Sequence, residues 1–302
     1  MTLARRRLDT QVCVMNPPSS RETLCAVLPE RALIAVAGPE WRSFLQGLIT
    51  QDVETLADGE LRYAALLTPQ GRLLYDLFLF GHADSATLDV PSAFRETLLA
   101  KLKLYRLRAK VELSAPDGDI HVLFGGDGTP APGPGWRLDP RLPELGWRTV
   151  GEASPRAGLR TGAAEDYDAH RLRLGVPDIL RDALSDKDYA LEANLDLLHA
   201  VDFRKGCFVG QETTSRMKRR SVVKSRLVPI TFEGPPPAPG AEVLAGTLRA
   251  GEVRSTGAGR ALALLRLDRA AGAGLTVDGE PVRLDTPEWL ADAVAAAVSA
   301  AA

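Results

Sequence analysis

A cysteine between two glycines is the feature of this sequence best suited to chemistry, and it lies in the octapeptide KGCFVGQE that begins at Lys205. A thiol reacts or binds metal as the thiolate, and a nearby cation or a helix N-terminus stabilises that anion. Lys205 stands two residues before Cys207, and residues 210–217 predict the start of a helix. Gly206 and Gly210 allow positive φ, which suits a loop that exposes its side chains. The pattern predicts a functional thiol at Cys207.

A packing role for the same cysteine is the alternative. In that case Gly206 ends a helix, Phe208 and Val209 fill the core, and Cys207 is a small buried apolar side chain. A cysteine hydrolase is not favoured, because His199 lies eight residues upstream and no base adjoins the thiol. The chain holds three cysteines, whereas iron-sulfur clusters usually take four, so a cluster at Cys207 would need a partner.

Charged side chains around the octapeptide supply further candidates for ligand contacts. The carboxylates that we consider are Glu212, Asp196, Glu192 and Asp76. Glu212 follows Gln211 at the predicted helix start, where it could accept hydrogen bonds from the N–H groups of a heterocycle. Six cations then follow within eleven residues: Arg216, Lys218, Arg219, Arg220, Lys224 and Arg226. Such a run is typical of a solvated face, and it also suits an acidic partner protein or RNA.

The apolar pattern predicts strands and helices that are mixed rather than regularly alternating. Runs typical of strands cover residues 31–37, 63–67, 72–80, 87–90, 110–113 and 120–124. Helical spacing of apolar residues covers 41–49, 94–105 and 164–174. Short strands separated by Gly/Pro turns follow at 226–232, 242–248, 251–255, 261–267 and 281–284, and they predict a small β-barrel. An α+β fold is therefore expected rather than a doubly wound sheet.

Composition restricts the class of protein. The 302 residues leave room for two or three domains, and the formal net charge of -2 gives no general reason to expect a nucleic-acid or membrane partner. Cys13, Cys25 and Cys207 lack paired spacing, which indicates a reducing compartment. We expect a cytoplasmic protein with an unstructured leader over residues 1–25. The alternative is an organellar presequence, which would place the protein in the mitochondrial matrix.

The octapeptide resembles the signature of the YgfZ family, folate-binding proteins similar to the T-protein (aminomethyltransferase) of the glycine cleavage system. Arg42–Val53, Leu67–Arg72 and Leu104–Lys110 resemble other segments of that family, in its order. The resemblance implies a three-lobed, aminomethyltransferase-like folate-binding fold. On this basis the expected parts are two intertwined α+β lobes over 26–224, a C-terminal β-barrel over 225–286 and an Ala-rich tail over 287–302.

The same resemblance implies a tetrahydrofolate-binding accessory factor for iron-sulfur protein assembly or repair, rather than an enzyme with turnover. Its partners would be folate and iron-sulfur assembly or client proteins, and the chain would be a monomer. Cys207 would be the functional thiol and could ligate a transient cluster shared with a partner. The residues implied for folate are Lys205, Gly206, Gly210, Gln211, Glu212, Tyr75 and Asp76, with the basic run meeting the glutamate tail.

The T-protein carries an Asp-Asp pair where this chain has Tyr75 and Asp76, which argues against aminomethyl transfer. A folate-dependent one-carbon transferase is nevertheless the first alternative function. An RNA-modification accessory protein is the second.

Overall fold

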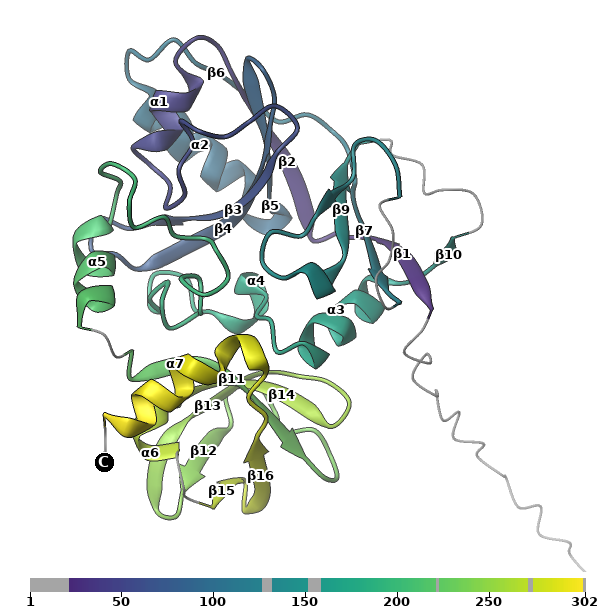
Figure 1. Cartoon of the computed structure of the whole chain (residues 1–302), viewed down its shortest axis with the longest axis vertical. Helices are drawn as coiled ribbons and strands as arrows, with labels where there is room; N and C mark the ends of the chain where they lie inside the picture. Colours follow the sequence, from purple (N-terminus) through teal and green to yellow (C-terminus); the bar gives the residue numbers. More distant parts are fainter. Residues whose placement is uncertain (1–21, 127–131, 152–158, 221–222, 271–273, 301–302) are drawn as a thin grey trace, which may run out of the picture.

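A computed structural model defines residues 22–126, 132–151, 159–220, 223–270 and 274–300 of the chain. Two five-stranded sheets and a closed barrel form its three lobes (Figure 1). The expected α+β class with a C-terminal β-barrel is thereby confirmed. Within these described ranges, no helix is both long and apolar enough to cross a membrane.

The first lobe is the sheet with strand order β3-β4-β5-β2-β6. Its strands are β2 (Arg31–Ala37), β3 (Leu61–Leu67), β4 (Leu73–Gly81), β5 (Ser85–Pro91) and β6 (Glu112–Ser114). Its helices are α1 (Trp41–Gln46), the 3-10 turn η1 (Ser92–Phe94) and α2 (Arg95–Arg106). Strand β4 is buried on both faces, since Leu77 and Leu79 pack with α1 and α2 while Phe78 and Phe80 join the core shared with the second lobe. Burial on both faces explains the continuous apolar run that predicted this strand.

The second lobe is the sheet with strand order β10-β1-β7-β9-β8, which the chain enters twice. Its elements are β1 (Thr23–Val27), β7 (Ile120–Gly125), β8 (Arg137–Leu138), the 3-10 turn η2 (Pro143–Leu145), β9 (Trp147–Val150), β10 (Arg160–Thr161) and α3 (Ala164–Arg173). The chain forms β1, crosses to build the first lobe and returns as β7, so the two lobes are intertwined.

The start of β1 corrects the expected leader. Residues 1–21 lie outside the described ranges, but the last three residues of the predicted leader, from Thr23 to Cys25, already belong to β1. They are ordered as a strand because they pair with β7, where Cys25 lies opposite Leu123 and is buried.

A connecting region with short helices leads from the second lobe to the barrel. It contains α4 (Ile179–Asp182) and α5 (Gln211–Arg219). The barrel strands are β11 (Ser225–Phe232), β12 (Glu242–Ala245), β13 (Leu248–Thr256), β14 (Arg260–Arg266), β15 (Leu275–Val277) and β16 (Glu280–Leu284). The run predicted as one strand over 242–248 is divided, because the chain turns after Ala245 and starts β13 at Leu248.

Two helices accompany the barrel: α6 (Leu267–Ala270) and α7 (Glu288–Ser299). Helix α7, in the Ala-rich tail, buries Leu290, Val294 and Ala297 in the barrel core. The indole Nε1 of Trp289 also donates a hydrogen bond to the carbonyl oxygen of Leu174, at 3.0 Å. The tail is therefore an integral part of the barrel lobe.

Candidate functional site

The octapeptide Lys205–Glu212, called here the signature segment, presents an exposed thiol. Cys207 is exposed, whereas Cys25 is buried in β1, and Cys13 lies outside the described residues. Burial also raises the pKa of Cys25, which disfavours its thiolate. Of the two described cysteines, Cys207 is therefore the one that is open to a reagent, a metal or a partner.

Lys205 holds the signature segment to the end of α1. Its side chain is buried and its Nζ donates hydrogen bonds to three carbonyl oxygens, those of Gln46 at 2.8 Å, Ile49 at 2.8 Å and Gln51 at 2.7 Å. Burial lowers the pKa of this ammonium to about 8, against the attraction of acids such as Asp52. The sequence predicts a cation that favours the thiolate of Cys207, but the ammonium is directed to backbone carbonyls because burial leaves it no water to bind.

The two glycines of the signature segment have different roles. Gly210 has a φ of +83° at the N-terminus of α5, and a Cβ there would lie 2.7 Å from the carbonyl oxygen of Thr68 and 3.0 Å from the Cα of Gly71. Gly71 itself has a φ of +82° in the β3–β4 turn. Glycine at position 210 thus lets the turn and α5 meet backbone to backbone.

Gly206 corrects the expectation that both glycines of the segment use positive φ. It is not among the residues with positive φ, and no atom lies within 4 Å of the position that its Cβ would take. The local backbone and packing therefore do not require glycine at this position.

Gln211 and Glu212 lie in the first turn of α5, over a shallow surface depression. Phe203, Ser215, Lys218 and Arg219 also line it, and Glu212 is exposed. Asp76 and Tyr75 line other hollows. None of the pockets found among the described residues brings Glu212 together with Asp76, so the residues implied for folate divide into two separate places.

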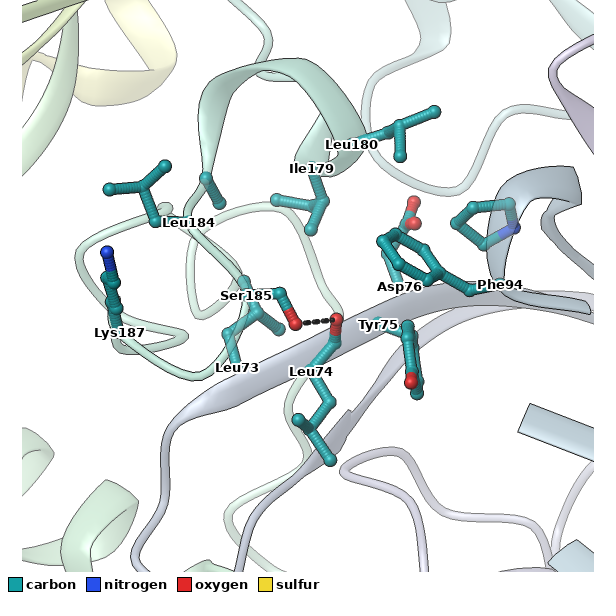
Figure 2. A pocket seen from close by; sticks show the side chains of 12 residues that line it. Leu73, Leu74, Tyr75, Asp76, Phe94, Ile179, Leu180, Leu184, Ser185 and Lys187 are labelled. Atoms are coloured by element: carbon teal, nitrogen blue, oxygen red, sulfur yellow. Dashed lines mark hydrogen bonds between the residues drawn. The ribbon is translucent and has the colours of Figure 1, made fainter. Parts of the chain in front are cut away.

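Asp76 lies in the interior, at the wall of a cavity of about 190 Å³ between β4, η1 and the α4 region. Its carboxylate accepts hydrogen bonds from Arg31 Nη1 at 3.1 and 3.2 Å and from the hydroxyl of Tyr63 at 3.3 Å. Burial, reinforced by Asp76, holds the pKa of Tyr63 well above its ordinary value, so the phenol stays protonated as a donor. Figure 2 shows the side chains of Tyr75 and Asp76 pointing to opposite sides of β4. The rings of Tyr75 and Phe94 have their centroids 5.1 Å apart.

The cavity wall is mainly apolar (Figure 2). Its lining residues are Leu73, Leu74, Tyr75, Asp76, Pro91, Phe94, Ile179, Leu180, Ala183, Leu184, Ser185 and Lys187. The hydroxyl of Ser185 donates to the carbonyl oxygen of Leu74 at 3.1 Å, so it is already engaged. The cavity can hold a flat, largely apolar ring that carries one N–H or O–H donor for the carboxylate of Asp76. The cavity is smaller than the roughly 300 Å³ at the low end for ligand pockets.

Sequence reasoning missed a buried set of ion pairs beside this cavity, called here the ionic cluster. Its members are Arg31, Asp76, Asp89, Asp139, Arg141 and Arg148. Arg31 Nε donates to Asp89 at 2.6 Å, and Arg148 of the second lobe contacts the other oxygen of Asp89. Burial alone would raise the pKa of Asp139, but Arg141 and Arg148 outweigh it and hold that pKa below its ordinary value.

The cluster joins the two intertwined lobes, because Asp89 lies on β5 and Arg148 on β9. A signal was present in the sequence, where single charges interrupt otherwise apolar strand runs. A charge in such a position is buried and needs a partner.

The other candidate carboxylates have structural partners. Asp196 forms ion pairs with Arg226 at 3.0 Å and Lys218 at 3.3 Å. Glu192 accepts a hydrogen bond from the backbone N–H of Tyr189 at 3.1 Å, and burial raises its pKa. Part of the basic run therefore has a structural role, since Arg226 is buried. No group of three or more His, Cys, Asp or Glu side chains in the described part of the chain is placed to hold a metal ion.

Comparisons with known proteins found a family model that matches the barrel and a solved structure that matches most of the chain. Residues 224–292 match the family model described as the CAF17 C-terminal beta-barrel domain. A solved structure of the glycine cleavage system aminomethyltransferase T from Bartonella henselae superimposes with a TM-score of 0.73, covering 89% of this chain and 86% of that one. At 18% sequence identity, this likeness concerns the fold alone.

Curated relatives share more of the sequence. The iron-sulfur cluster assembly factor IBA57, mitochondrial, from Mus musculus is 31% identical over 94% of this chain and 86% of its own length. The protein of the same name from Homo sapiens is 32% identical over 85% of this chain and 81% of its own. The IBA57 homolog of Mycosarcoma maydis is 35% identical over 70% of this chain, which spans only 59% of that longer protein.

Proposed function

The chain belongs to the IBA57 family, related to the YgfZ family that its signature resembles, and we propose that it is an accessory factor in iron-sulfur cluster assembly or repair. The iron-sulfur cluster assembly factors to which it is similar support this role. So does the barrel match, which extends the likeness beyond the signature segment.

The exposed thiol of Cys207 is the observation that carries the proposal. Lys205 and Gly210 fix the two sides of the signature segment to the first lobe, while the thiol between them is exposed. Such a thiol can donate one thiolate to iron, or accept sulfur, without disturbing the core. Since clusters usually take four thiolates, a partner protein has to supply the remaining ligands.

Complementation tests this role. Cells that lack the protein should lose the activity of iron-sulfur enzymes, most strongly under oxidative stress, while glycine cleavage continues. The wild-type chain should restore that activity and Cys207→Ala should not, whereas Cys25→Ala, which removes a buried thiol, should restore it. Full complementation by a stable Cys207→Ala protein would remove the thiol from the mechanism.

Tetrahydrofolate is the ligand that we propose for the cavity beside Asp76. The apolar wall and the single carboxylate suit a pterin ring with an N–H donor, and Lys187 at the lining suits a carboxylate of the tail. The volume of about 190 Å³ accommodates the ring system rather than the whole molecule. Glu212, Lys218 and Arg219 line a separate depression and would then not form the ring site.

Calorimetry with tetrahydrofolate tests this assignment. Ala183→Phe, which fills the cavity, should abolish binding, and Glu212→Gln should leave the affinity unchanged. The reverse pattern would place the ligand at α5, and no binding by the wild-type chain would remove folate altogether. Equal affinity for mono- and polyglutamylated folate at low salt would exclude a charged contact with the tail.

A one-carbon transferase is the second candidate, because the fold is that of an aminomethyltransferase. The identity of Tyr75 argues against it, since a phenol stands where the T-protein has one acid of its Asp-Asp pair. Asp76 is also held by Arg31 and Tyr63. Consumption of methylene-tetrahydrofolate by the purified protein with an amine acceptor would favour the transferase.

The mitochondrial relatives support the second of the two expected locations, the mitochondrial matrix. The cytoplasm stays a prediction. Fusion of residues 1–25 to a fluorescent reporter distinguishes the two in a eukaryotic cell, because only a presequence would direct the reporter to mitochondria.

A further inference from the structure

The C-terminal end of α2 and the residue that follows it carry the most exposed large apolar side chains among the described residues. Leu107 is 86% exposed and Leu104 is 72% exposed. By contrast Leu98, Leu99 and Leu102, earlier in α2, are buried. The helix therefore turns one set of leucines into the core and presents a second pair to the solvent at its C-terminal end.

The backbone at Leu107 is strained as well as exposed. Its φ of 46° and ψ of -107° lie in a region that side chains with a Cβ rarely adopt. Hydrogen bonds of the next turn hold the chain there, including one from the N–H of Ala109 to the carbonyl oxygen of Arg106 at 2.8 Å. Glycine would fit this backbone without strain, yet the position holds a leucine that packs on nothing in the core. Strain of this kind persists most often at functional positions.

The two leucines lie among uncompensated positive charges. Five cations occur in ten residues without an acid: Lys101, Lys103, Arg106, Arg108 and Lys110. None of them forms an ion pair with a carboxylate in the described part of the molecule. The chain as a whole has a formal charge of -2, so this concentration of positive charge is local. Arg226 and Lys218 of the later basic run differ, because both pair with Asp196.

A shallow groove of about 400 Å³ adjoins the leucines. Gly38 and Pro39, which precede α1, form one wall, and residues 106–112 form the other. A hydrogen bond from the N–H of Lys110 to the carboxylate of Glu40, at 2.8 Å, holds the walls together. The surface thus combines two exposed leucines, a run of cations and a shallow groove.

We propose that this surface, comprising Leu104, Leu107 and the cations around them, is a docking site for an acidic protein. The two leucines would enter an apolar depression of the partner, and Arg106 and Arg108 would meet its carboxylates. The groove would receive one projecting side chain. A protein fits better than an anionic membrane, because a lipid surface cannot place a projecting group in a groove.

The docking surface is independent of the proposed iron-sulfur role, and cross-linking tests it. A photo-reactive benzoylphenylalanine replaces Leu107 in the full chain inside cells, and the matched control carries it at Leu248, which is 62% exposed on the barrel. The expected result is a protein adduct at position 107 whose cross-linked peptide is rich in Asp and Glu. The charge reversals Arg106→Glu and Arg108→Glu together should reduce the adduct by about tenfold.

The identified partner is then measured against the purified chain. Leu107→Gly should weaken its binding by about tenfold, because the inserted side chain is lost. The thermal midpoint should stay the same or rise, since glycine relieves the backbone strain. Leu248→Ser, which removes another exposed leucine, should leave affinity unchanged. A structural role for Leu107 predicts the opposite, a lower midpoint with unchanged affinity.

Several results would overturn the proposal. They are adducts at 107 no stronger than at 248, adducts only to a second copy of this chain, and a partner whose affinity does not respond to Leu107→Gly. Sedimentation with vesicles of phosphatidylcholine and phosphatidylserine supplies the membrane control. Binding to them that the two charge reversals abolish would assign the surface to lipid instead.

Discussion

The ionic cluster and the signature segment are both built from polar residues, but one is closed and the other is open. In the cluster, Asp89 is fully buried and receives two arginines from different lobes. In the signature segment, the polar group of Lys205 is buried while the thiol of Cys207 is exposed. The difference separates two uses of polar residues, since the cluster secures the lobes and the segment leaves one reactive atom available. Substitutions in the ionic cluster should therefore reduce mainly stability, whereas substitution of the thiol in the signature segment should reduce mainly function.

The largest loss of stability is expected for Asp89→Ala. This change leaves Arg31 and Arg148 buried without their carboxylate, which should lower the free energy of unfolding by about 3–5 kcal/mol. Chemical denaturation measures it. Glu22→Ala, which breaks an exposed ion pair with Arg160, is the control and should cost less than about 1 kcal/mol. Equal losses for the two variants would show that the cluster is not a structural tie.

Gly210→Ala should have the next largest effect. The new Cβ would meet the β3–β4 turn at 2.7 Å, and the positive φ is unfavourable for alanine, so a loss of roughly 2 kcal/mol is expected. Gly206→Ala is the matched control in the same segment, because its Cβ would enter open space. It should change stability by less than about 0.5 kcal/mol. If the two alanine variants unfold at the same denaturant concentration, the contact between α5 and the turn is not a constraint.

Lys205 should make stability depend on pH in a particular direction. Its pKa is about 8 in the folded chain and near 10.5 when unperturbed, so between these values the unfolded chain binds more protons. Stability of the wild-type chain should therefore rise with pH across this window, relative to Lys205→Met, by about 1 kcal/mol per pH unit. Denaturation of both proteins at pH values below and above 8 measures the difference. Wild-type stability that falls relative to Lys205→Met as the pH rises would contradict the lowered pKa.

The smallest effect on stability is expected for Cys207→Ala. An exposed thiol contributes little packing, so the free energy of unfolding should change by less than about 0.5 kcal/mol. Thermal and chemical denaturation of the same preparation used for complementation would check this. A large loss of stability would mean that Cys207 is a packing residue after all, and complementation data for it would lose their meaning.

Local patterns predicted most elements of the fold. Strands β3 and β4 followed from two neighbouring apolar runs, and the barrel followed from short strands between turn residues. The missed elements are β1, β8, β9, β10, β15, α4 and α6. All of these have two to five residues, and such short segments show little periodicity. Their structure depends on partners far away in the chain, as when β1 pairs with β7.

The candidate site was also predictable only in part, because local patterns are visible in the sequence and distant contacts are not. Residue types and spacing indicated Cys207 and the start of α5. They could not show that Arg31 reaches Asp76 across 45 positions, or that Lys205 turns to carbonyls near α1. Both contacts are set by tertiary packing. Carboxylates that looked available in the sequence, such as Asp196, proved to be occupied by arginine or lysine.

Helix α1 has a consequence for how a partner could engage this protein. Its N-terminal end borders the groove through Gly38 and Pro39, and its C-terminal end contacts the signature segment, where the N–H of Val209 donates to the carbonyl oxygen of Gly47. Six helical residues span only about 9 Å. A partner held at the groove would therefore stay one short helix away from the signature segment, and a second contact there would form at a raised effective concentration.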